Sequence, residues 1–82
     1  MRKLQVIIVP FHLRKGVLKP AGHEPGWTAR QAERRAKELS DRYAGVGVYG
    51  VWVDDLTLDA SDLHQLAAVG DVPDLAALLA VA

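Results

Sequence analysis

The stretch Thr28–Gly45, TARQAERRAKELSDRYAG, decides the fold more than any other part of the chain. Its small and apolar residues recur at intervals of three and four, the spacing of one face of an amphipathic helix. Thr28 is a favourable N-cap whose capping box Gln31 completes, and Gly45 stands where a glycine often ends a helix. The sequence predicts a helix over residues 29–44 whose face is mostly alanine, so it can lie close against a sheet. The residues of this face are Ala29, Ala32, Ala36, Leu39 and Tyr43.

Two stretches that flank this helix are rich in β-branched residues and predict strands. They are residues 4–9, LQVIIV, and residues 46–53, VGVYGVWV. Each is apolar on both faces, which indicates a sheet covered on both sides. Pro10 is expected to end or bulge the first strand, because proline cannot donate to a ladder.

The segments between the first strand and the helix predict a hairpin and a loop. Arg14-Lys15-Gly16 indicates a turn, since glycine adopts positive φ at no steric cost. A short return strand would follow over residues 17–19. Residues 20–26 contain two prolines and two glycines and predict a loop. Trp27 is expected to pack at the start of the helix.

The C-terminal part of the chain predicts two short helices. The first carries Leu63, Leu66 and Ala67 and ends at Gly70. The second opens at Asp71-Val72-Pro73-Asp74, with proline in the first turn, where its missing N–H does no harm. Because the second is apolar nearly all round, it has to be buried.

The order β-β-α-β-α-α predicts a small α+β protein with one domain over residues 1–82. Its sheet would be antiparallel and three-stranded, with the strands in the order 2-1-3. The long helix would cover one face, and the two C-terminal helices would cover the other. In an alternative arrangement the second face forms a homodimer.

Charge is segregated along the chain. All ten lysines and arginines lie in residues 1–44, which have a net charge of +6, and residues 45–82 have a net charge of −6. Such asymmetry indicates a polar partner surface. In the simpler interpretation the acidic half folds back on the basic half, or the molecule is a plain dipole.

The motifs that carry chemistry elsewhere lack their context here. Gly45–Gly50 matches G-x-G-x-x-G, but a helix precedes it and a strand follows it, the reverse of a dinucleotide site. Adjacent Asp54 and Asp55 point to opposite faces if both are in a strand. The three histidines follow no metal-ligand spacing, and there is no cysteine. We therefore expect no enzyme, no cofactor and no metal.

No signal peptide or membrane span is expected from the sequence. The apolar run after Met1-Arg2-Lys3 is shorter than the usual 7–15 residues, and no stretch approaches the roughly 18 apolar residues of a span. A cytoplasmic location is the corresponding expectation.

The sharpest functional signal is a basic surface. Arg30, Arg34 and Lys37 share one side of the predicted helix, and the predicted hairpin turn adds further cations. The predicted partner-binding residues are Arg14, Lys15, Arg30, Arg34, Arg35, Lys37 and Arg42. In the simpler interpretation this is a solvated helix with ion pairs such as Glu33–Lys37 and Glu38–Arg42.

The leading hypothesis is a non-enzymatic accessory protein that docks on a larger protein or nucleoprotein complex with an acidic surface. A phage or mobile-element inhibitor of anti-CRISPR type is one version, by analogy of size alone. The alternative is direct nucleic-acid binding by the same face, with affinity that falls steeply with salt. A third hypothesis is self-association through the apolar residues 75–82, and the protein is expected to be a monomer or a homodimer.

Overall fold

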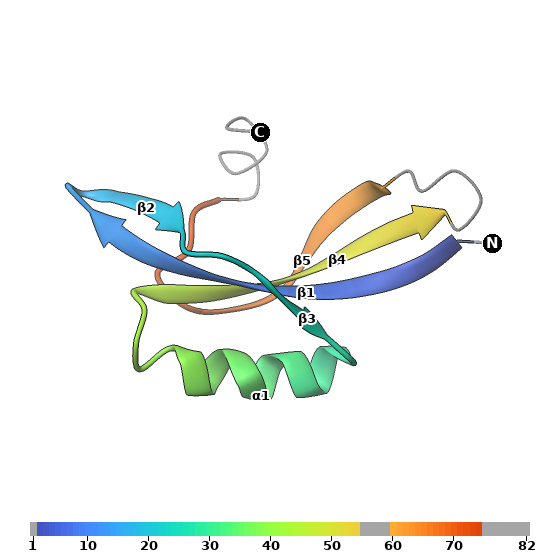
Figure 1. Ribbon diagram of the computed structural model, residues 1–82, viewed down its shortest axis with the longest axis horizontal. Helices are drawn as coiled ribbons and strands as arrows, with labels where there is room; N and C mark the ends of the chain where they lie inside the picture. Colours follow the sequence, from blue (N-terminus) through green and yellow to red (C-terminus); the bar gives the residue numbers. More distant parts are fainter. Residues whose placement is uncertain (1, 55–59, 75–82) are drawn as a thin grey trace.

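The computed structural model describes residues 2–54 and 60–74. In these residues one antiparallel sheet is packed against one helix, α1, which runs along one side of the strands (Figure 1). The predicted α+β class with an antiparallel sheet is confirmed. The elements are β1 (Arg2–Arg14), β2 (Val17–Pro20), β3 (Glu24–Gly26), α1 (Ala29–Leu39), β4 (Gly45–Asp54) and β5 (Ala60–Gly70).

The strands are ordered β2-β1-β4-β5, with β3 also paired to β1. The predicted order of three strands is therefore present as β2-β1-β4. The predicted number of strands is wrong, because β3 and β5 complete a five-stranded sheet in the described residues. β3 lies inside the predicted loop and pairs Val6 with Gly26 and Ile8 with Glu24. The N-terminal half of β1 thereby gains a second neighbour.

β1 continues through Pro10, where we expected it to end or to form a bulge. The Pro10 carbonyl accepts a hydrogen bond from Ala21 N at 2.8 Å, so this residue's polar backbone faces the outer edge of β1. Of the outer strands, β3 pairs with residues 6–8 and β2 with residues 11–14. Pro10 falls between them, where no ladder requires its missing N–H.

The predicted helix with Leu63, Leu66 and Ala67 is wrong, because this segment is strand β5. β4 is long, and its outer edge would otherwise expose a row of unpaired backbone groups. β5 pairs with that edge, and Ala67 and Val69 lie opposite Val48 and Val46. The other predicted C-terminal helix, residues 75–82, lies outside the described residues.

The core lies between α1 and one face of the sheet. It contains apolar side chains from β1 and β4 and the alanine face of the helix, and Tyr43 with Ala67 and Val69 of β5 packs at its border. Its buried members are Val6, Ile8, Ala32, Ala36, Leu39, Val46 and Val48. Since alanine dominates the helix side, the backbone of α1 lies close to the strands and its outer side is fixed relative to the sheet.

Candidate partner-binding surface

Thr28 caps the N-terminus of α1, as the sequence predicts. The Thr28 hydroxyl accepts a hydrogen bond from Gln31 N at 3.1 Å, and the Thr28 carbonyl accepts the first helical bond from Ala32 N at 2.9 Å. This cap supplies an acceptor to a backbone N–H group of the first turn that has no partner within the helix. It fixes the phase with which the next residues project from the helix.

The helix ends earlier than predicted, at Leu39 instead of residue 44. Ser40 forms the C-cap, where its N–H bonds to the Ala36 carbonyl at 2.9 Å and its hydroxyl donates to the Lys37 carbonyl at 2.6 Å. A serine hydroxyl that bonds to a nearby carbonyl competes with helical hydrogen bonding. Gly45 is the first residue of β4 and not the residue that follows the helix end.

Three cations share the outward side of α1. Arg30, Arg34 and Lys37 are exposed, and together with Glu33 they line a shallow depression of about 250 Å³. Ala32, Ala36 and Leu39 face the opposite way and are buried. Across the described residues, no ion pair involves any of the three cations, so their charge is available to a partner. We call Arg30, Arg34 and Lys37 the cation row.

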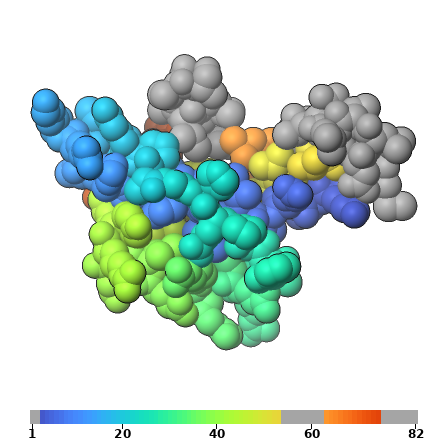
Figure 2. Space-filling model, viewed as in Figure 1, coloured from blue at the N-terminus to red at the C-terminus, as the bar shows by residue number. Residues whose placement is uncertain are grey.

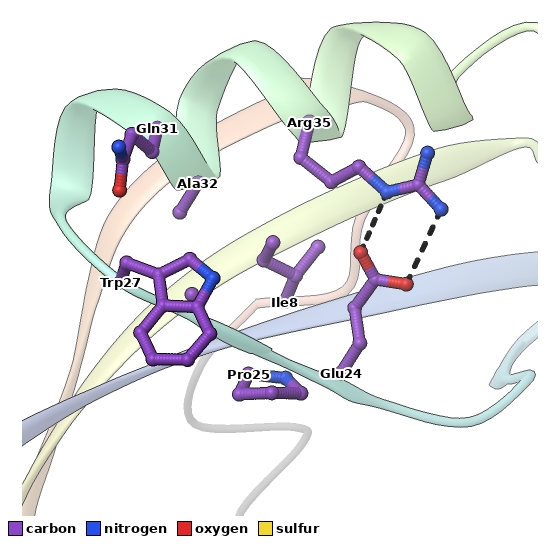
Figure 3. A pocket seen from close by; sticks show the side chains of 8 residues that line it. Ile8, Glu24, Pro25, Trp27, Gln31, Ala32 and Arg35 are labelled. Carbon is purple, nitrogen blue, oxygen red and sulfur yellow. Dashed lines mark hydrogen bonds and ion pairs between the residues drawn. The ribbon is translucent and has the colours of Figure 1, made fainter.

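Arg35 is engaged within the molecule. Its Nε lies 2.7 Å from Glu24 Oε1 (Figure 3), and its Nη1 lies 3.2 Å from Glu38 Oε2. The Glu24 carboxylate accepts hydrogen bonds from Nε and Nη2 and raises the pKa of Arg35, and the hydrogen bond from Nη1 to Glu38 adds to the shift. Arg35 thus ties β3 to α1, and two carboxylates neutralise its charge.

The remaining predicted binding residues lie away from the cation row. Arg14 and Lys15 belong to the β1–β2 turn, where Lys15 and Gly16 have positive φ as the hairpin requires. Figure 2 shows this turn projecting at the upper left, away from the green ridge that α1 forms at the bottom. Arg42 is exposed after the end of the helix. The predicted seven-residue surface is therefore not one cluster.

The i,i+4 ion pairs expected on α1 are absent from the described residues. Neither Glu33–Lys37 nor Glu38–Arg42 forms, and Glu38 pairs with Arg35 instead. Glu24 already restrains the Arg35 side chain, so the additional ion pair with Glu38 costs less side-chain entropy. The simpler interpretation, in which ion pairs within the helix use its charges, therefore does not hold for the cation row.

Sequence reasoning missed the position of Trp27. We expected this residue to pack at the start of the helix, but its side chain is 85% exposed. It forms one wall of a second pocket, of about 260 Å³, between β3 and α1 (Figure 3). The only sign of this exposure in the sequence was that Trp27 follows Pro25-Gly26. β3 ends at Gly26 and is too short to enclose a large side chain.

The other sequence candidates gather into no site. The described residues contain no group of three or more potential metal ligands, and Asp55 lies outside them. Residues 2–54 and 60–74 also contain no helix with the length and apolarity needed to cross a membrane.

Comparison with family models finds no match, and comparisons with curated proteins and with solved structures find none either. Function has to be inferred from the chemistry of the surface.

Proposed function

We propose that this protein is a non-catalytic binding module that docks on an acidic surface of a larger protein through the cation row of α1. The observation that carries the proposal is the set of three exposed cations, Arg30, Arg34 and Lys37, which form no ion pair in the described residues. They stand on a helix whose opposite face is locked into the core.

The geometry suits an extended acidic surface. Seven residue steps separate Arg30 from Lys37, so the row is about 10 Å long at 1.5 Å per residue. Complementary charge at such a surface steers association and fixes the orientation of the partner. Because the net charge of the whole chain is zero, the attraction has to come from a local group of cations such as this row.

Nucleic-acid binding by the same face is the second candidate. The exposed Trp27 favours it, because an aromatic side chain beside cations offers a base a surface for stacking. A nucleic-acid backbone carries a charge at every nucleotide and is usually bound in a continuous basic groove, whereas acids interrupt this face. Glu33 lines the same depression as the cation row, and Glu24 and Glu38 lie nearby on Arg35.

A matched pair of charge variants tests the proposal. R30Q/R34Q/K37Q removes the cation row, and R14Q/K15Q/K19Q removes three exposed cations from the β1–β2 hairpin. Both variants have the same net charge, so only the position of the loss differs. Each exposed ion pair contributes about 0.5 kcal/mol, so the loss of three should weaken binding about tenfold.

The ligands are poly-glutamate, as a stand-in for an acidic protein surface, and single-stranded and duplex DNA, at about 50 and 200 mM salt. We expect poly-glutamate to bind the wild type and the hairpin variant with similar affinity and the cation-row variant about tenfold more weakly. Equal weakening in both variants would show a response to net charge alone and contradict the proposal. DNA binding tighter than poly-glutamate binding, with a steep fall in salt, would favour the second candidate.

A further inference from the structure

The pocket beside Trp27 has an apolar interior and a polar rim. Ile8, Pro25, Trp27 and Ala32 supply the apolar lining, and Gln31 and the Arg35–Glu24 pair border it (Figure 3). In the view of Figure 3, Trp27 stands on one side and the Arg35–Glu24 pair on the other, with Ile8 between them. The pocket is therefore shaped to receive an apolar group.

The two elements between which this pocket lies, β3 and α1, are held close together. A Cβ on Gly26 would lie 2.8 Å from the Ala32 Cβ and 3.0 Å from the Val6 Cγ1, so β3 can pass this close to α1 only with glycine at this position. The Arg35–Glu24 pair ties the same two elements together. A preformed pocket lowers the cost of ordering on binding.

The size of the pocket selects a single side chain. Its volume of about 260 Å³ lies below the roughly 300–1,000 Å³ of small-molecule sites. Tryptophan and arginine are enriched among the residues that dominate protein interfaces, and Trp27 is almost fully exposed at the mouth. A leucine-sized or aromatic side chain from a partner would bury its apolar surface against Trp27, Pro25 and Ile8.

The charge beside the pocket determines the character of the partner. Gln31 and Arg35 line the pocket, and Arg30 and Arg34 each precede one of them by a single position on the same two turns of α1. The pocket and the cation row are therefore adjacent flanks of one helix. Glu24 and Glu38 share the charge of Arg35, so the rim on that side carries a net charge of −1, and the free cations next to the pocket are Arg30 and Arg34.

We propose that the Trp27 pocket receives one apolar side chain from an acidic segment of the partner protein, whose carboxylates bind Arg30 and Arg34. This inference rests on the proposed function and adds the partner's chemistry, an apolar anchor flanked by acids. We favour a peptide side chain over a nucleobase, because a base also needs hydrogen-bond partners at its edge, and of the polar side chains that line the pocket Glu24 and Arg35 already bond to each other, which leaves Gln31.

Two short acidic peptides test this inference by calorimetry and by the indole N–H signal of Trp27 in NMR spectra. One carries a central leucine among glutamates and aspartates, and the other carries serine at that position. We expect the wild type to bind the leucine peptide about tenfold more tightly, because a buried leucine side chain contributes that much or more. The Trp27 indole signal should shift with the leucine peptide alone.

The variants separate the pocket from the cation row. W27S should lose the leucine preference and keep its affinity for the serine peptide, whereas R30Q/R34Q should weaken both peptides alike. L13S is the matched control, because Leu13 is another exposed apolar side chain, on the β1–β2 hairpin. It should retain the leucine preference.

Three results would overturn the inference. Equal affinity of the wild type for the two peptides, or a leucine preference that persists in W27S, would contradict binding of a side chain in the pocket. Either result would leave the proposed binding at the cation row unaffected. Failure of the wild type to bind either peptide would remove the proposed function as well. Trp27-dependent binding of an oligothymidylate, without peptide binding, would assign the pocket to nucleic acid.

Discussion

At the scale of single residues, Tyr49 is the buried polar group that the fold does not satisfy. Its ring lies against Gly47, its side chain is almost fully buried, and its hydroxyl has no hydrogen-bond partner in the described residues. A buried hydroxyl without a partner costs about 1–3 kcal/mol. We therefore expect Y49F to gain about 1 kcal/mol in the free energy of unfolding, measured by urea denaturation. A loss of more than 1 kcal/mol would mean that the hydroxyl is bonded.

The same residue gives a dependence on pH. Burial raises the pKa of Tyr49 above its usual value of about 10. Above that pH the unfolded state releases the tyrosine proton before the folded state does, so the free energy of unfolding falls as the pH rises toward the folded pKa. The wild type should thus lose more stability than Y49F between about pH 8 and pH 10.5. Equal losses in the two proteins would contradict a buried, neutral Tyr49.

At the scale of elements, α1 depends on small residues beneath it. Ala36 is fully buried against the sheet, and Ala29, on the same helix, is exposed. Inserting a larger side chain into a packed core costs about 1–3 kcal/mol. A36L should lower the free energy of unfolding by about 2 kcal/mol, and A29L should leave it within about 0.5 kcal/mol. Equal stability of the two variants would contradict the close packing of α1.

The elements also show where sequence patterns suffice. Thr28 and the alanine face determine α1 locally, and the β-branched runs of β1 and β4 carry their own strand signal. β5 has no such signal, because Leu63, Leu66 and Ala67 are spaced as on a helix. Its conformation comes from the open edge of β4, and the paired strands shift register near Tyr49 to accommodate it. β3 is equally non-local, since pairing with Val6–Ile8 is what makes it a strand.

At the scale of the whole molecule, the cation row forms no ion pair with the acidic half in the described residues. Both ion pairs of α1 in the part of the chain described here join Arg35 to acids of residues 1–44. The sequence predicted that Arg30, Arg34 and Lys37 share a side, because helical spacing alone determines it. It could not predict that Arg35 is neutralised or that Trp27 is exposed, because both depend on where β3 lies.

The central claim is that an acidic partner meets α1 at the cation row. The most direct measurement is a backbone NMR titration of the wild type with poly-glutamate, followed residue by residue. We expect the largest amide shifts at Arg30, Arg34 and Lys37, with the β1–β2 turn at Lys15 and Gly16 unchanged. Shifts confined to that turn, or no saturable shift on α1 at about 50 mM salt, would contradict the claim.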